Sequence, residues 1–257
     1  MKLTKVKDNA IGFLTLALVL IIWELFARQA QSFYFPPFST ILATFYQDWF
    51  SPLFAEHAVP SLVRMFIGYL IASVLGVVIG VLIGSYRGLF ETLDPFFEFL
   101  RAIPPPIIIP VGLLLLGIGD TMKITVIVFG VFWPVLLNSA DGARSISQER
   151  LDTARNFGLG RLEAIRRVVF PSALPMIFTG LRVGLALALI MVVISEMIGS
   201  TNGLGYYILD AQRTFAVPQM FGGILLLGIL GYGLNNLFLL LEARVLSWHH
   251  GQAGQQS

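Results

Sequence analysis

The sequence has 257 residues, of which 56% are hydrophobic and 12% charged, and its mean hydropathy is +0.80. Soluble domains carry about 25% charged residues, so this composition is that of an integral membrane protein in a lipid bilayer. The formal charge of +2 is not gathered into a basic face, which argues against nucleic-acid binding, and the absence of cysteine excludes disulfides and thiolate chemistry.

Six apolar runs come close to the roughly 20 residues that a helix needs to cross the hydrocarbon core. The first follows a basic start and resembles a signal peptide, but Trp23 and Glu24 interrupt its end, so we expect a retained helix. The third is short and follows three prolines, Pro104 to Pro106, which cannot continue a helix. The predicted spans cover about residues 11–27, 62–84, 107–119, 121–138, 174–198 and 221–246.

The distribution of positive charge predicts the orientation of these spans, because Lys and Arg are retained on the cytoplasmic side. The two terminal segments and the connections after the second and fourth spans hold twelve of the 17 Lys and Arg residues. We therefore predict that both termini and residues 144–171 are cytoplasmic. Residues 28–60 are too polar to span and should form an external loop with an interfacial helix.

The longest charged interval runs from Leu151 to Pro171, between the fourth and fifth spans. Ser145 and Gln148 match a capping box and predict a helix over about 146–157. Gly158 supplies the backbone freedom to end this helix in a left-handed turn, after which a second short helix leads to the prolines before the fifth span. Composition leaves two interpretations open: amphipathic helices resting on lipid, or a docking surface for a soluble partner.

Polar side chains inside the spans are candidates for a transport path, because burying them in a bilayer is costly. For Arg182 we favour structural pairing over substrate contact, since its long stem can reach the cytoplasmic face. For Glu196, lining a path and pairing with a neighbouring helix are equally open. Asn138 belongs to the amides that more often join helices. The path candidates are Glu196, Ser195, Arg182 and Asn138.

The charged interval also carries a spaced motif. Asp152, Thr153 and Ala154 are followed after three residues by Gly158 and, nine residues later, by a Val-x-Phe-Pro run ending at Pro171. This resembles the signature loop of the integral membrane subunits of bacterial ABC importers, which reads Glu-Ala-Ala, three residues, Gly, nine residues, Ile, one residue, Leu-Pro. The replacements are conservative.

Further stretches resemble the nitrate, sulfonate and taurine branch of that permease family and cover about residues 60–246. They are S-L-V-R-M-F-I-G-Y from Ser61, the glycine series Gly76, Gly80 and Gly84, L-D-P from Leu93, L-R-A-I-P-P from Leu100, F-P-S-A-L-P from Phe170, G-L-R from Gly180, S-E-M-I from Ser195 and G-L-G-Y from Gly203. We interpret the glycine series itself as a helix contact rather than a site.

The resemblance implies an all-α, type I ABC importer permease fold whose loop forms a coupling helix in a groove of the ATP-hydrolysing subunit. Ala154 and Gly158 would let two backbones approach, Asp152 and Arg155 would set the register by charge, and Phe157 would anchor in a pocket. The residues assigned to this coupling loop are Asp152, Thr153, Ala154, Arg155, Phe157, Gly158, Arg161 and Pro171.

The sequence has no G-x-x-x-x-G-K-[ST] motif, so ATP and Mg²⁺ are expected on a partner chain. It shows no nucleophile with its base, carboxylate dyad or metal-ligand pattern, so we expect no catalytic residue, metal or cofactor here. The resemblance implies a permease in the bacterial inner membrane with two ATP-binding cassette subunits, a second permease chain, most simply an identical one, and an extracytoplasmic substrate-binding protein. The implied substrate is nitrate, a sulfonate or taurine; relatives in this branch also move riboflavin or thiamine precursors.

We expect one permease domain over residues 1–250, with its core at about 60–246 and the coupling loop at about 144–171, and a flexible tail over 251–257. The competing class is a secondary carrier or channel without an ATPase partner. Such a protein would show paired intramembrane acids or internal repeats, and neither is evident in the sequence. A membrane scaffold without transport would have no ATPase partner for the loop.

Overall fold

The structure, a computed structural model, describes the backbone of residues 2–247 and the side chains of residues 12, 14–86 and 88–247, so the expected tail over 251–257 lies outside the described residues. All regular elements in this range are helical, which confirms the all-α prediction. The long helices are α1 (Lys2–Ala30), α3 (Val59–Gly84), α6 (Asp120–Arg144), α9 (Phe170–Met197) and α11 (Val217–Val245). The shorter elements are α2 (Phe38–Trp49), η1 (Phe54–Ala58), α4 (Arg87–Arg101), η2 (Pro105–Ile108), α5 (Ile109–Leu116), α7 (Gln148–Asn156), α8 (Arg161–Ala164), η3 (Ile165–Val169) and α10 (Leu204–Arg213).

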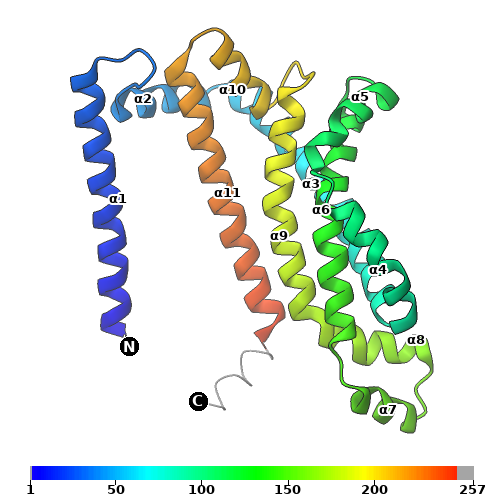
Figure 1. Ribbon diagram of the computed structural model, residues 1–257. Coiled ribbons are helices and arrows are strands. Elements are labelled where there is room, and N and C mark those ends of the chain that lie inside the picture. The colour runs from blue at the N-terminus through cyan, green and yellow to red at the C-terminus, as the bar shows by residue number, and fades with distance from the viewer. Residues whose placement is uncertain (1, 248–257) are drawn as a thin grey trace.

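Four helical segments of the described chain are long and apolar enough to cross a membrane, and they correspond to the second, fourth, fifth and sixth predicted spans. Their backbone groups are bonded within each helix, as lipid requires. The first predicted span lies in α1, a helix of 29 residues that stands beside α11 in Figure 1. Its side chains Leu14 and Leu25 are exposed, as on a lipid-facing helix. A span in α1 stays a prediction. The four segments are Phe54–Gly84, Asp120–Arg144, Arg161–Met197 and Val217–Val245.

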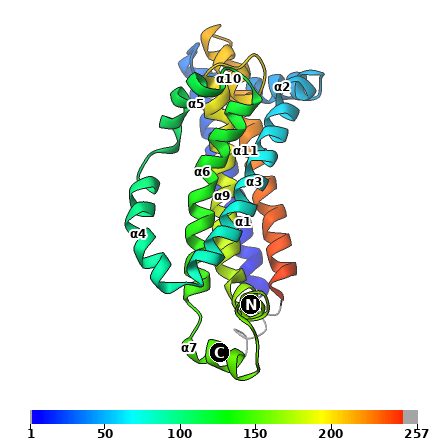
Figure 2. The same ribbon diagram turned by 90° about the vertical axis from the view of Figure 1, so that its right-hand side faces the viewer.

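The third predicted span is not a single helix. Residues 107–119 contribute only the outer part of a bent pair, in which Gly88–Arg101 and Pro105–Leu116 meet at 79°. Pro104 and the two prolines after it stop α4, since proline lacks the N–H that a continuing helix needs. The pair lies together on one side of α6 in Figure 2 and makes a fifth crossing if both parts are counted as one span.

The centre of the molecule consists of α3, α6 and α9, which lie side by side in Figures 1 and 2. α3 approaches α6 closely because glycines form its facing side. A Cβ at Gly80 would meet the carbonyl oxygen of Leu136, and one at Gly84 would meet that of Ala140. The expected helix contact of the glycine series is confirmed. Close backbone packing of this kind holds helices together in lipid, where the hydrophobic effect is absent.

The two ends of the molecule carry different elements. One end, at the top of Figure 1 and called the outer end below, carries α2, α5 and α10. The opposite, inner end carries α7 and α8, together with the start of α1 and the end of α11. α2 is a helix in the predicted external segment 28–60. It is fastened to α1 through Glu24, whose Oε2 accepts the Ser39 N–H at 3.0 Å.

Candidate functional site

The inner loop, residues 144–171, starts where α6 ends. Ser145 belongs to that end, because its N–H donates to the Asp141 carbonyl at 2.9 Å and its hydroxyl to the Gly142 carbonyl at 2.9 Å. The predicted capping box is therefore wrong. Ser147 occupies the position before α7 and makes no side-chain cap, and α7 begins at Gln148, two residues later than expected. The Ser-x-x-Gln pattern is a local signal, and the continuation of α6 overrides it.

Gly158 ends α7 as predicted. Its φ angle is +75°, in the left-handed region that only glycine adopts readily. Gly158 N–H donates to the Arg155 carbonyl at 2.8 Å and Leu159 N–H to the Ala154 carbonyl at 3.1 Å, the pair of bonds that defines a Schellman motif. These bonds satisfy carbonyls that the end of the helix would otherwise leave unpaired. They also fix the direction in which the chain leaves α7.

The side chains of α7 divide between the protein and the surface. Ala154 is buried at 4% exposure, and Leu151 packs on the apolar cluster beneath the loop. Asp152 and Arg155 form an ion pair with each other at 3.0 Å on the surface. The Thr153 hydroxyl donates to the Glu149 carbonyl at 2.7 Å. α7 is thus anchored by its small and apolar positions, while its charged positions remain accessible.

Two large apolar side chains of the inner loop have no protein cover. Phe157 is 82% exposed, just before the Gly158 turn, and Leu162 is 77% exposed just after it. Phe157 was expected as an anchor for a partner, whereas Leu162 was missed. Its signal was visible in the sequence, since Leu162 is a lone apolar residue between Arg161 and Glu163. Exposed apolar side chains that flank one rigid turn are typical of an interaction surface.

The second helix of the loop does not stop at the prolines. α8 begins at Arg161 and continues through the π-helical turn η3 into α9, so that Arg161–Met197 forms one helical segment of 37 residues. Pro171 lacks an N–H inside this continuous segment, and the π-helical turn η3 lies directly before it, where the regular backbone bonding changes. The helix break expected at the prolines before the fifth span, Pro171 and Pro175, is therefore absent. The inner loop is thus continuous with a membrane-spanning helix.

A second polar cluster, the outer network, lies at the outer end of α3, α6 and α9. Glu196 is fully buried there, and its Oε1 lies 2.8 Å from Arg64 Nη1. The Ser61 hydroxyl lies 2.7 Å from Glu196 Oε2, which also accepts the Gly205 N–H at 3.0 Å. A buried carboxylate is tolerated only when it is paired and hydrogen-bonded in this way. The outer network comprises Ser61, Arg64, Asp120, Glu196 and Asn202.

Arg64 connects the remaining members of the outer network. Its Nε lies 2.8 Å from Asp120 Oδ1 at the start of α6, and its Nη2 donates to Asn202 Oδ1 at 2.7 Å. One guanidinium thus joins α3, α6, α9 and the turn before α10. Gly203 packs directly against the network, because a Cβ added at this position would overlap the Glu196 carboxylate. Sequence reasoning missed Arg64, although a charge within a predicted span should have prompted a search for its partner.

The structure does not bring the four path candidates together. Glu196 and Ser195 are buried at the outer end, so for Glu196 the structure shows the pairing alternative. Arg182 lies 14 residues earlier, roughly 21 Å along the helix at about 1.5 Å per residue. It is exposed and donates to Asn235 Oδ1 of α11 at 3.2 Å. Asn138 donates to the Pro134 carbonyl in its own helix at 2.8 Å.

Comparisons with known proteins agree with this geometry. Residues 76–247 match the family model described as binding-protein-dependent transport system inner membrane component. The chain is 30% identical over 245 residues to the putative aliphatic sulfonates transport permease SsuC of Bacillus subtilis, covering 95% of this chain and 89% of that protein. It is 30% identical over 242 residues to the taurine permease TauC of Escherichia coli, covering 91% and 88% of the two chains.

Two further matches concern nitrate import and the fold. The nitrate import permease NrtB of Synechocystis is 30% identical over 186 residues, which are 72% of this chain and 68% of that protein. Among solved structures, an inward-facing form of the MetNI methionine ABC transporter superimposes with a TM-score of 0.67 at 20% identity, covering 75% of this chain and 96% of that chain. At this identity the structural match establishes the shared fold.

Proposed function

Because the chain belongs to the family of binding-protein-dependent transport system inner membrane components, we propose that it imports a small solute of the sulfonate, taurine or nitrate type. It is an inner-membrane permease of an ABC importer and not itself an ATPase. The choice of substrate class is supported by the relatives, whose names refer to aliphatic sulfonates, taurine and nitrate. The names of these three relatives do not refer to riboflavin or a thiamine precursor.

The inner loop serves as the coupling element, and the exposed pair Phe157 and Leu162 is the observation that carries this assignment. An ATP-binding cassette subunit would cover both side chains, and Asp152, Thr153, Arg155 and Arg161 would surround them with polar contacts. Ala154, Gly158 and Pro171 would act by fixing the loop on its helices. ATP and Mg²⁺ would bind to two such subunits.

This assignment sets the orientation. The inner end, with the start of α1, the end of α11 and the inner loop, faces the cytoplasm, which agrees with the excess of Lys and Arg in those segments. The outer end, with α2 and α10, then faces the substrate-binding protein. Residues 1–250 act as one permease domain.

The transport path forms between two identical chains related by a two-fold axis, the commonest symmetry of such assemblies. Arg182 supports this part of the proposal, because it is exposed on α9 although it lies in the middle of a span. A cation there would attract an anion entering the path. Glu196 and Ser195 would hold the helices together at the outer end and would not contact the substrate.

The test is reconstitution of the chain with its ATPase subunit and binding protein in proteoliposomes. We expect ATP-dependent uptake of one labelled solute among taurine, an alkanesulfonate and nitrate, and no uptake without the ATPase. Gly158→Ala should reduce uptake, because alanine is strained at a positive φ. Gly160→Ala is the matched control, since neither glycine has a neighbour within 4 Å of an added Cβ and only Gly158 has a positive φ. Uptake without the ATPase would contradict the proposal.

A further inference from the structure

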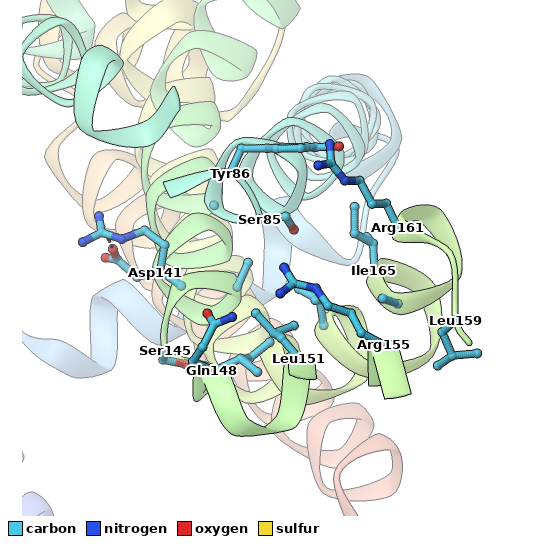
Figure 3. Close-up of a pocket in the computed structure, with 16 residues that line it drawn as sticks. Ser85, Tyr86, Asp141, Ser145, Gln148, Leu151, Arg155, Leu159, Arg161 and Ile165 are labelled. Atoms are coloured by element: carbon cyan, nitrogen blue, oxygen red, sulfur yellow. Dashed lines mark ion pairs between the residues drawn. The ribbon is translucent and has the colours of Figure 1, made fainter. Parts of the chain in front are cut away.

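A cavity of about 630 Å³ lies behind α7, on the side of the inner loop that faces the membrane-spanning helices, and the proposed function makes no use of it. Its wall is formed by the inner ends of α3 and α6, by α7, and by the segment from α8 to η3. Figure 3 shows side chains from all four segments around it. The volume falls within the range of about 300–1,000 Å³ that is usual for small-ligand sites.

The cavity wall carries an excess of positive charge. Arg144, Arg155 and Arg161 come from three different elements, and Asp141 is the single carboxylate among the lining residues that the structure describes. Arg144 is held by stacking over the Phe90 ring at 3.9 Å, with Asp141 3.8 Å from its guanidinium. Arg161 forms no ion pair with any residue whose side chain is described. Arg155 is paired with Asp152 at 3.0 Å through Nη1, and both Arg155 and Arg161 line the cavity. Arg161 is therefore the unpaired guanidinium of the described wall, and Arg155 adds a second one whose pair with Asp152 is exposed.

These groups have the chemistry that phosphate binding requires. Guanidinium groups donate two parallel hydrogen bonds to phosphate oxygens, which makes arginine the preferred residue for such contacts. In Figure 3, Arg155 and Arg161 extend from the inner loop toward the end of α3, and Tyr86 lines the same cavity from the segment after α3. Tyr86 Oη has no hydrogen-bond partner within the described part of the chain and is a further donor.

Part of the wall is apolar. Ile146, Leu151, Ile165 and Val169 line the cavity and belong to the apolar cluster beneath the loop. A charged rim over an apolar floor fits a group that is anionic at one end and apolar at the other. The cavity also lies where α3 and α6 end, which is the level of the membrane surface if the orientation proposed above holds.

We propose that this cavity binds a phosphate-bearing anion, held by Arg155, Arg161 and Tyr86. The phosphate comes from the headgroup of an anionic phospholipid of the inner leaflet, or from free phosphate. That the cavity lies at the inner leaflet depends on the orientation given under the proposed function. The charge and shape of the cavity are independent of that orientation.

Binding would act on the inner loop. Gln148, Leu151 and Arg155 follow each other at helical spacing and face the cavity, while Phe157 projects away from the chain. A phosphate bridging α7 and α8 to the end of α3 would fix the inner loop against the membrane-spanning helices. The same loop would then carry the ATPase surface around Phe157 and Leu162 and the anion site behind α7, with Arg155 and Arg161 at the boundary between the two.

The test measures binding to the full chain purified in a neutral detergent, by native mass spectrometry with phosphatidylglycerol, phosphatidylcholine or inorganic phosphate. We expect phosphatidylglycerol or inorganic phosphate to bind and phosphatidylcholine to bind at least tenfold more weakly. Arg155→Gln with Arg161→Gln should raise the Kd about tenfold or more, the change that corresponds to losing a charge-assisted hydrogen bond. The Kd of Arg161→Lys, which keeps the charge, should lie between the Kd of the native protein and that of the double Gln variant.

The matched control is Arg150→Gln with Arg166→Gln, which removes the same charge from the same loop outside the cavity and should change the Kd less than twofold. Binding of phosphatidylglycerol alone assigns the lipid as the source, and binding of inorganic phosphate alone assigns the free anion. Binding of neither anion, or equal losses in the two double variants, would overturn the proposal. Because no transport is measured, the result is independent of the uptake experiment.

Discussion

Arg64 on α3 and Glu196 on α9 form an ion pair of 2.8 Å in which the Arg64 side chain is 5% exposed and the Glu196 side chain 0%. The two residues are 132 positions apart in the sequence. Three of the stretches that resemble the permease family, beginning at Ser61, Ser195 and Gly203, meet at this pair. The pair therefore joins three separate stretches of the sequence at the outer end of the helix bundle.

Glu196→Gln should destabilise the protein strongly. The substitution leaves Arg64 without its buried partner, and removing one member of a buried pair costs about 3–5 kcal/mol. Thermal unfolding of the purified permease measures the effect. Glu163→Gln is the control, because the Glu163 pair with Arg167 at 3.0 Å is exposed and should be worth about 0–1 kcal/mol. Equal shifts in Tm for the two variants would contradict the structural role of the outer network.

Gly203→Ala should destabilise more than Gly117→Ala. Both glycines have a positive φ, +115° and +71°, so both variants carry backbone strain of about 1–2 kcal/mol. Only at Gly203 does the added Cβ also meet the Glu196 carboxylate, whereas nothing lies within 4 Å of it at Gly117. The measurement is the difference in Tm between the two variants. A Gly203→Ala protein as stable as Gly117→Ala would show that the turn does not depend on Glu196.

Phe157→Ala and Leu162→Ala should weaken ATPase binding without loss of stability. Both side chains are exposed, so their removal opens no cavity in the fold. Loss of a central apolar anchor commonly costs more than about 1–2 kcal/mol of binding energy, or roughly tenfold in Kd. Copurification of the ATPase subunit and its Kd are the readouts. Leu114→Ala is the control, since Leu114 is 86% exposed at the outer end. Similar losses in all three variants would refute a specific docking surface.

Tyr207→Phe should change the response of the protein to high pH. Burial raises the pKa of the Tyr207 hydroxyl, and the Asp48 carboxylate, which accepts its hydrogen bond at 2.6 Å, raises it further. A raised pKa means that the folded state retains the proton, so this stabilisation is present below the unfolded pKa of about 10 and declines as the pH rises above it. The Tm of the native protein should therefore fall more steeply above about pH 10 than that of Tyr207→Phe. Parallel curves would contradict this coupling of α10 to α2.

The sequence predicted those features that depend on local pattern. Hydropathy located the spans in α3, α6, α9 and α11, and the glycine at position 158 located the end of α7. Prolines 104–106 indicated a weak third span but not the 79° bend, which depends on packing against α6. The predicted capping box was wrong because the Ser145 hydroxyl donates to a carbonyl at the end of α6 instead.

Contacts between distant parts of the sequence could not be predicted from local patterns. Nothing near Arg64 in the sequence identifies Glu196, Asp120 or Asn202 as its partners, since these come from three separate segments. The cavity behind α7 likewise depends on the ends of α3 and α6 meeting the loop. In both cases the sequence shows the polar and charged residues that take part. Which of them come together is determined by the fold and could not be predicted.

The most direct test of the coupling role uses the absence of cysteine from the chain. Phe157→Cys introduces a single thiol at the tip of the inner loop, and Leu114→Cys places one at the outer end as the control. Each variant is assembled with the ATPase subunit and treated with a maleimide reagent that also captures lysine. The account predicts a cross-linked product with the ATPase from Phe157→Cys and none from Leu114→Cys. Cross-linking from Leu114→Cys, or none from Phe157→Cys in an assembled complex, would contradict it.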